Sequence, residues 1–422
     1  MNPTDLISPI YHFFITSNDF NGITDFDLFR QWNVNPTEGY KLLKQLVEFD
    51  FCTIQSSSNP HIIYSALPTQ DEAISLINKM ICSEDFSTYP ICVYPTPAYL
   101  KNHRNVDNYT PYARRMALGT PQIKPLFFDF GVLHSYLNNP KYTLFLRDYY
   151  GSLSYTLESD NLVDKAGYYK LETFGLGYNQ DNIRVIVSFP RYLNRLSPSQ
   201  QIHWESYELS SPCKVLCSYM DNIISGSWRF PKSLASGVLN ERSLVNKLWG
   251  SIFEDKLFLN DFSLEQLPPN FSFLFIPTQK SLMEFYHLLD KLFSDDINIK
   301  HLRRLLKYGC ENLPPVTEPY EENIASLNAL KLWMDNVYHL KSGMTVGDEI
   351  VAPLKKVRKL RQPQAHKIIT ENSYDKNVYE LQNKILEDIY NSLMKLRIIL
   401  STHPKAMQEN SSFNTDDMIY VF

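Results

Sequence analysis

The spacing of apolar residues near the C-terminus is the feature that most constrains how this chain folds. There, apolar side chains recur at steps of three and four residues, as in Leu381, Ile385 and Ile389. Such steps place the side chains on one face of an α-helix, whereas a strand would show alternation. Long helices with apolar stripes bury those stripes by packing side by side. We therefore expect an all-α helical bundle over residues 279–403, followed by a polar tail over residues 404–422.

Residues 85–265 follow a different pattern, in which short runs of alternating apolar and polar residues are separated by turn residues. Residues 142–147 and 184–188 are examples, and runs of this kind indicate strands. Aromatic residues make up 14% of the chain, and they favour strands as well as contact surfaces. Residues 203–207 combine His, Trp, Glu and Tyr, but without a second ligand cluster we interpret them as core and interface. The prediction for residues 85–265 is a β-rich domain.

The N-terminal segment, residues 1–66, is expected to hold three helices and two short strands. Asn35 and Pro36 mark a helix start, because Asn can cap a helix and Pro suits its first turn. Strands are predicted at residues 51–55 and 61–65, with a turn between them. Three helices followed by a hairpin resemble a winged helix-turn-helix.

Charge bears on what this N-terminal segment can bind. From residue 21 to residue 64 there are three basic and five acidic residues, a net charge of −2. Binding of duplex DNA at physiological salt relies on several Lys and Arg contacts to phosphates. Protein contact or a packing role is therefore favoured over DNA binding. A helix over residues 67–84 would link the segment to the β-rich domain, and the whole chain is predicted to be an α+β protein.

Composition excludes several classes of protein. The chain has 422 residues, enough for more than one domain, and a net charge of −5, which argues against a protein covered in basic surface. Its six cysteines are scattered and include no CxxC pair, so neither a disulfide framework nor a zinc site is expected. No apolar run approaches about 18 residues, and the N-terminus lacks the pattern of a signal peptide. We expect a cytoplasmic protein with no membrane contact, no metal and no cofactor.

One segment departs from the acidic character of the chain, because residues 355–361 contain five basic side chains. The five are Lys355, Lys356, Arg358, Lys359 and Arg361. Residues 340–410 carry 12 Lys and Arg against 8 Asp and Glu, a net charge of +4, so the remainder of the chain carries −9. A positive patch on an acidic protein concentrates the attraction for a polyanion in one place.

Arg361 and His366 are the candidate catalytic residues of this segment. An Arg side chain stays protonated and can stabilise charge on a phosphate, while a His titrates near neutrality and can move a proton. RNA supplies its own nucleophile, the 2′-hydroxyl, so its cleavage needs only proton transfer and phosphate stabilisation. On an ideal helix the two side chains would point about 140° apart. A helix break at Pro363, or a second copy of the motif across a dimer, would bring both to one cleft.

The sequence Arg361-Gln-Pro-Gln-Ala-His366 resembles the R-x4-H motif of the HEPN superfamily, and its place late in a helical region before one long terminal helix is similar too. The resemblance covers residues 280–403. It implies a metal-independent endoribonuclease of toxin–antitoxin or antiviral defence type, acting as a dimer with two motifs at a shared cleft. It also implies Arg361 and His366 as the catalytic pair and Gln362 as a polar accessory residue. The family more often has Asn, Asp or His at the accessory position, and Pro363 is not typical of it.

Two functions therefore stand as hypotheses. In the first, the chain is a bacterial toxin or antiphage ribonuclease that acts by abortive infection and dimerises through its bundle. Its aromatic-rich middle domain would then bind a trigger or inhibitor protein. The residues expected to contact RNA are Gln362, Lys355, Lys356, Arg358, Lys359 and Lys367. In the second, the chain is a non-catalytic regulator that binds nucleic acid or protein through its winged-helix-like segment, and the bundle serves only as a dimerisation module.

Overall fold

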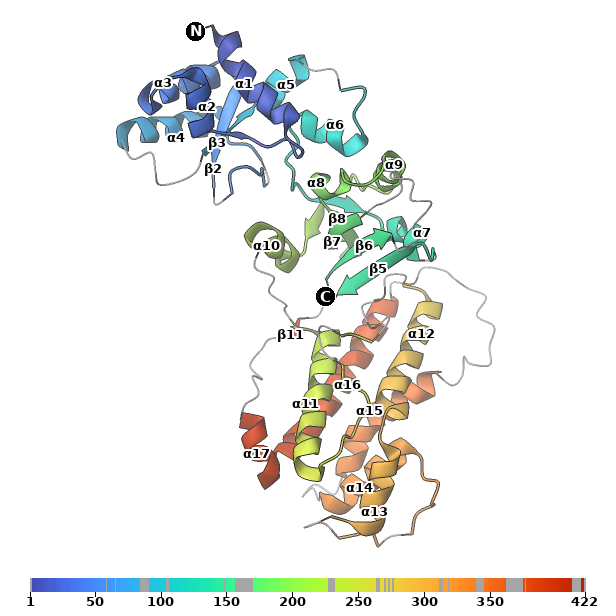
Figure 1. Cartoon of the computed structure of the whole chain (residues 1–422). Helices are drawn as coiled ribbons and strands as arrows, with labels where there is room; N and C mark the ends of the chain where they lie inside the picture. Colours follow the sequence, from blue (N-terminus) through green and yellow to red (C-terminus); the bar gives the residue numbers. More distant parts are fainter. Residues whose placement is uncertain are drawn as a thin grey trace, which may run out of the picture. The chain divides into compact units, whose positions relative to one another are not determined.

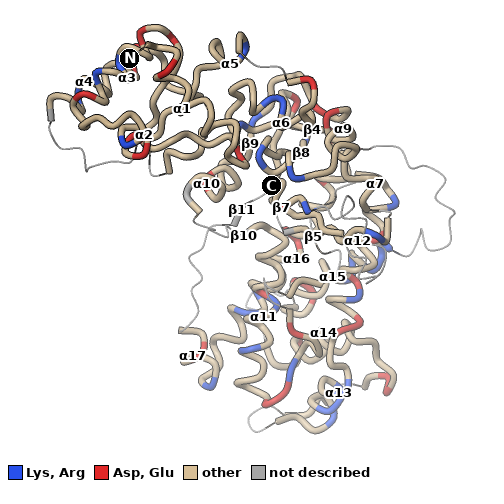
Figure 2. Tube along the Cα trace, turned by 45° about the horizontal axis from the view of Figure 1, so that its top comes forward, with Lys and Arg blue, Asp and Glu red and all other residues tan. Residues whose placement is uncertain are grey.

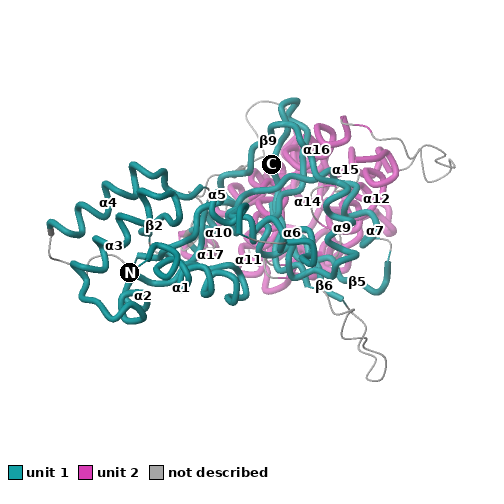
Figure 3. The backbone as a smooth tube through the Cα atoms, turned by 90° about the horizontal axis from the view of Figure 1, so that it is seen from above, with its two compact units in different colours: residues 1–227 teal, residues 228–422 magenta. Residues whose placement is uncertain are grey.

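The structure, a computed structural model, is of the α+β class and divides into two compact units, residues 1–227 and residues 228–422 (Figure 1, Figure 3). It describes residues 2–57, 59–64, 66–83, 91–103, 106–137, 139–147, 149–155, 170–226, 232–262, 266–268, 271, 274, 277–310, 314–317, 319–338, 345–361, 375, 377–411 and 419–420. The predicted α+β class is confirmed, and the structure adds that the two larger sheets are antiparallel and that helices make up most of the C-terminal part.

The first unit begins with helices that surround a small sheet. Its elements are α1 (Pro3–Thr16), β1 (Ile23–Thr24), α2 (Asp25–Trp32), α3 (Pro36–Glu48), β2 (Cys52–Ser56), α4 (Gln70–Ser83) and β3 (Ile91–Pro95). The predicted start of α3 is confirmed: the Asn35 side chain accepts a hydrogen bond of 3.0 Å from the Glu38 N–H, and Pro36 lies in the first turn. Thr24 caps α2 in the same way, through the Asp27 N–H.

The small sheet differs from the predicted hairpin. Its order is β1-β3-β2, and β2 pairs antiparallel with β3, not with residues 61–64, the described part of the predicted second strand. β3 lies beside β2 in the sheet. All five residues of β3 are buried, so this pairing removes an apolar run from water. Within the described part of the competing segment, Gln55 donates to the Ile62 carbonyl (2.6 Å), which holds the segment as a loop.

The rest of the first unit surrounds a six-stranded antiparallel sheet of order β4-β8-β7-β6-β5, with β9 pairing β7. The strands are β4 (Leu126–Phe128), β5 (Tyr142–Arg147), β6 (Tyr150–Tyr155), β7 (Lys170–Asn179), β8 (Arg184–Ser188) and β9 (Cys213–Val215). The helices are α5 (Pro97–His103), α6 (Pro111–Ala117), a 3-10 turn (Phe130–Leu133), α7 (His134–Leu137), α8 (Pro190–Leu193), α9 (Pro198–Ser206) and α10 (Cys217–Ser225). The strands predicted at residues 142–147 and 184–188 are confirmed as β5 and β8.

The second unit is a group of packed helices. Its elements are β10 (Lys232–Ser233), α11 (Leu234–Phe253), α12 (Gln279–Asp290), a π-helical turn η3 (Lys291–Asp295), α13 (Ile299–Tyr308), α14 (Ser326–Val337), α15 (Val346–Arg361), α16 (Asn377–Ser401), α17 (Pro404–Ser411) and β11 (Ile419–Tyr420). β10 and β11 pair in parallel.

Helix α11 lies in this second unit, although the sequence pattern led us to assign its residues to the β-rich domain and to begin the bundle at residue 279. It packs on α16, and Glu241 of α11 accepts a hydrogen bond of 2.6 Å from Arg397 of α16. Both side chains of this ion pair are nearly buried. α17, in the segment predicted to be a polar tail, also packs on α11 and buries Ala406 completely.

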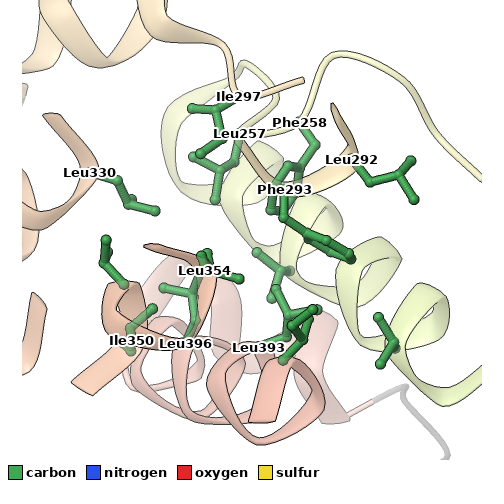
Figure 4. Packing of buried hydrophobic residues seen from close by; sticks show 14 of the residues in the cluster. Leu257, Phe258, Leu292, Phe293, Ile297, Leu330, Ile350, Leu354, Leu393 and Leu396 are labelled. Atoms are coloured by element: carbon green, nitrogen blue, oxygen red, sulfur yellow. The ribbon is translucent and has the colours of Figure 1, made fainter. Parts of the chain in front are cut away.

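One apolar core holds the helices of the second unit together. Figure 4 shows side chains from α14, α15, α16, η3 and the loop after α11 meeting in one cluster. The predicted stripe of α16 is buried from Ile385 onward, whereas Leu381 at its start is 41% exposed. Among the described residues, no helix combines the length and apolar character that spanning a bilayer requires.

Replacing Leu396 by Ala should destabilise the second unit, because Leu396 is 1% exposed within this core. Loss of a buried Leu lowers the free energy of unfolding by about 2–5 kcal/mol. The matched change Ile398→Ala, at a 50% exposed position of the same helix, should lower it by less than about 0.5 kcal/mol. Urea unfolding followed by circular dichroism measures both values. Equal losses in the two variants would contradict the described packing.

Candidate functional site

Helix α15 carries the basic segment at its C-terminal end. The apolar stripe of the helix is buried against the core, which leaves the basic residues on the remaining positions. Lys356 and Lys359 are exposed, while Lys355, Arg358 and Arg361 are partly exposed. Three basic residues fall in the last turn, where cations are stabilised by the partial negative charge of the helix end. Part of the basic character therefore stabilises the helix itself.

Arg361 is tied to a buried carboxylate. Its Nη1 donates a hydrogen bond to Oδ2 of Asp290, the last residue of α12, and Asp290 is 0% exposed. Arg358 Nε lies 3.8 Å from the other oxygen of Asp290, and Arg358 Nη2 lies 3.6 Å from Asp295 in η3. The last turn of α15 is thus fixed against the end of α12 and the π-helical turn that follows it.

The complete burial of Asp290 explains why it is paired with Arg361. An ionised carboxylate away from water is costly unless a cation and hydrogen bonds compensate it. Arg361 supplies the hydrogen bond while its own side chain stays 35% exposed. A guanidinium has five N–H donors in one plane, so the group that holds Asp290 can also hold an anion on its other edge. The geometry suits both a structural role and a phosphate contact.

Other basic residues of the segment also have acidic partners. Lys356 donates to Asp388 of α16 at 2.7 Å, and Arg358 has the two contacts described above. Part of the positive charge counted from the sequence is therefore balanced by nearby carboxylates. The exposed Lys359 extends from the same turn.

His366, Gln362 and Lys367 lie outside the described residues. The described part of α15 ends at Arg361, and the next described residue is Asp375. That Arg361 and His366 meet in one cleft, through a helix break at Pro363 or across a dimer, therefore stays a prediction.

Asp290 and Asp295 were not among the predicted site residues, although the sequence holds a signal for the first. Leu282 and Tyr286 begin the predicted stripe of α12, and Asp290 follows Tyr286 at the helical spacing of four. A carboxylate on a stripe expected to be buried requires a cation. Pairing it with Arg361, 71 residues later, needs knowledge of how the helices pack.

Two histidines of the first unit lie near a possible nucleophile, one near a serine and one near a cysteine, but neither pair forms a catalytic dyad. Ser135 Oγ lies 3.3 Å from His203 Nε2, but the same nitrogen lies 3.0 Å from the Val132 carbonyl. A carbonyl only accepts, so Nε2 carries the proton and cannot act as a base toward Ser135. Cys92 Sγ lies 3.4 Å from His61 Nδ1, but burial raises the pKa of this thiol to about 12, which leaves no thiolate at neutral pH. Of residues 203–207, which were interpreted as core and interface, Trp204 is completely buried, whereas Glu205 and Ser206 are exposed.

Helix α4 covers part of α3 in the N-terminal segment. Gln70 at the start of α4 donates to the Val47 and Glu48 carbonyls at the end of α3, and Lys44 donates to Asn78. A helix that reads DNA bases must present an open face to the major groove. One side of α3 is thus packed against α4, while Lys41 and Gln45 stay exposed.

Comparison of the chain with protein-family models, with curated proteins and with solved structures gave no match. Within the described ranges, no group of three or more His, Cys, Asp or Glu side chains is arranged to hold a metal ion.

Removal of Arg361 should destabilise the second unit, because Arg361→Ala leaves the carboxylate of Asp290 buried without its hydrogen-bonded cation. We expect a loss of about 3 kcal/mol in the free energy of unfolding. Lys356→Ala, which breaks a more exposed pair with Asp388, should cost less than about 1 kcal/mol. Chemical denaturation measures both.

A further variant separates the ion pair from packing. Combining Arg361→Ala with Asp290→Leu removes the buried charge together with its partner, so most of the lost stability should return. If Arg361→Ala proves as mild as Lys356→Ala, Asp290 does not depend on Arg361.

The burial of His301 leads us to predict that the stability of the second unit depends on pH. This residue of α13 is 3% exposed and its Nδ1 lies 3.0 Å from Asp255. Burial lowers the pKa of His301, and Asp255 opposes that shift only in part. The unfolded chain therefore binds a proton more readily than the folded one. The stability contributed by neutral His301 should be present above pH 6.5 and fall as the pH drops below it. Unfolding between pH 7.5 and 5 should show a smaller loss in His301→Gln, and an unchanged slope would refute the assignment.

Proposed function

We propose that the second unit is an endoribonuclease of the HEPN type, with Arg361 and His366 as its catalytic pair. The observation that supports this most directly is the anchoring of Arg361 by the buried carboxylate of Asp290. A group that stabilises charge in a transition state is most effective when its position is fixed beforehand. Arg361 is fixed in this way, five residues before His366 in the sequence, and α16 follows as one long helix.

The chemistry follows from the two side chains. The 2′-hydroxyl of a ribose attacks the adjacent phosphorus and the bond to the 5′-oxygen of the next nucleotide breaks. The 2′-hydroxyl loses a proton and the departing 5′-oxygen gains one; the imidazole of His366 carries out one of these transfers and water carries out the other. Arg361 stabilises the negative charge that grows on the phosphate oxygens. The products are a cyclic 2′,3′-phosphate and a 5′-hydroxyl, and no outside nucleophile is consumed.

Asp290 acts in this scheme as a positioning residue. Its carboxylate binds one edge of the Arg361 guanidinium, which directs the plane of that group and restricts its rotation. Arg358, on the same helix turn, lies against Asp290 and Asp295 and keeps the turn in place. The exposed Lys359 of the same turn would attract the RNA backbone.

The biological setting we propose is bacterial toxin or antiphage defence, in the cytoplasm, where RNA cleavage stops growth of an infected cell. Two copies of the second unit would associate and bring two R-x4-H motifs to one cleft. The first unit, with its six-stranded sheet and aromatic side chains, would bind a trigger or an inhibitor protein.

A non-catalytic regulator is the second candidate, and one observation favours it specifically. Arg361, Arg358 and Lys356 all have carboxylate partners, as expected of side chains that only stabilise a helical bundle. In that case the bundle would dimerise and the N-terminal segment would contact protein or nucleic acid. The two functions differ in the consequence of losing His366.

The decisive test is RNA cleavage by the full chain beside His366→Ala, Arg361→Lys and Asp290→Asn. The wild type should cut RNA in the presence of a chelator, and His366→Ala should lower the rate at least about 100-fold with unchanged thermal stability. Arg361→Lys keeps the charge but loses the planar donor set, so kcat should fall more than KM changes. Asp290→Asn should lower kcat by a smaller factor.

Expression in a bacterial host supplies the control, since growth arrest by the wild type should disappear in His366→Ala at equal soluble yield. Persistence of cleavage in purified His366→Ala would reject the ribonuclease. A wild type that neither cleaves RNA nor slows growth, beside a folded His366→Ala that behaves identically, would favour the regulator.

A further inference from the structure

Helix α13 presents a second basic surface that the R-x4-H motif does not include. Its basic residues are Lys300, Arg303, Arg304 and Lys307. They are spaced as i, i+3, i+4 and i+7, so they share one face of the helix, and α13 contains no acidic residue. We call these four residues the α13 stripe. Figure 2 shows Lys and Arg gathered along this helix.

The opposite face of α13 is fixed in the core of the second unit. His301, Leu302, Leu305 and Leu306 are all buried. The helix therefore cannot insert its apolar side into a membrane, as a basic amphipathic helix at a bilayer surface would. Only the polar face can meet a partner, so the partner is recognised by charge.

The two arginines in the middle of the α13 stripe contact other parts of the second unit, and the two lysines at its ends are exposed to solvent. Arg303 donates to the Ile324 carbonyl (3.1 Å), and Arg304 Nη2 lies 3.7 Å from Asp255. Lys300 and Lys307 are exposed, and Arg304 keeps 60% of its side chain exposed. Beside them, the ring of Tyr308 is 68% exposed and lies 5.3 Å from the Lys307 ammonium. Exposed cations next to an exposed aromatic ring are the combination that binds single-stranded nucleic acid.

The stripe lies a short way along the chain from the Arg361 site. Asp295, which contacts Arg358, precedes Lys300 by five residues. Five residues span at most roughly 18 Å. The backbone positions of Asp295 and Lys300 therefore lie within that distance, which a strand of a few nucleotides can span.

We propose that the α13 stripe binds the sugar-phosphate backbone of single-stranded RNA, with the Tyr308 ring available for base stacking. The proposal rests on the proposed function in taking RNA as the ligand. In that setting the stripe holds the strand while the R-x4-H motif acts on it, and it determines how far from the cut the substrate must extend.

The test measures binding separately from cleavage. Fluorescence anisotropy with a labelled single-stranded RNA of about 20 nucleotides uses the full chain carrying His366→Ala. Lys300→Gln with Lys307→Gln should weaken binding about tenfold and lower the slope of log K against log salt by about 1.4. The matched control, Lys280→Gln with Lys384→Gln, removes the same charge from exposed positions of α12 and α16. It should change affinity less than about twofold.

Each result is decisive. Equal affinity loss in the two pairs would show a general charge effect and overturn the proposal, as would a full chain that binds no RNA. Polyglutamate competing as well as RNA at equal charge would identify an acidic protein as the partner instead. Cleavage that survives His366→Ala would reject the nuclease assignment and not the α13 stripe, because the stripe is judged by the difference in affinity between the two lysine pairs. Tyr308→Leu should weaken binding further, because base stacking on the ring is lost.

Discussion

A single buried carboxylate determines how the end of α15 can be placed. Asp290 has no access to water, so the folded state of the second unit requires a cation beside it. Arg361 and Arg358 meet that requirement from one helix turn, and together they join the end of α12 to the end of α15. Arg361, the proposed phosphate-binding residue, is thus also a residue on which the packing of α15 against α12 depends. A substitution of Arg361 is therefore expected to change stability, and any test of the proposed activity needs a control for folding.

Helical periodicity predicted most of the second unit, because a stripe of apolar residues on a long helix is a local property of the sequence. The stripe of α16 and the helix start at Asn35 and Pro36 are both present in the structure. The partners of these elements were harder to predict. β2 pairs with β3 across an intervening helix, and α11 joins helices that follow it much later in the chain. Pairing is decided by which buried surfaces fit, and a single sequence does not contain that information in any local pattern.

The candidate site shows the same division. The basic residues of α15 were visible as a run of like charge, but their carboxylate partners come from α12, η3 and α16. A count of charge along the sequence therefore overstated the field at this end of the helix. The α13 stripe was missed for the opposite reason: four basic residues interrupted by leucines do not form a run, and only their shared helix face makes them one surface.

The pairing of α11 with α16 has a consequence for how the chain matures during synthesis. Glu241 and Arg397 are separated by 156 residues, and a ribosome adds about 5–20 residues per second. Roughly 8–30 seconds therefore separate the emergence of Glu241 in α11 from the emergence of its partner Arg397 in α16. During that interval the apolar face of α11 lacks the surface of α16 that buries it in the folded protein. Chaperones or neighbouring chains can bind this face before the second unit folds.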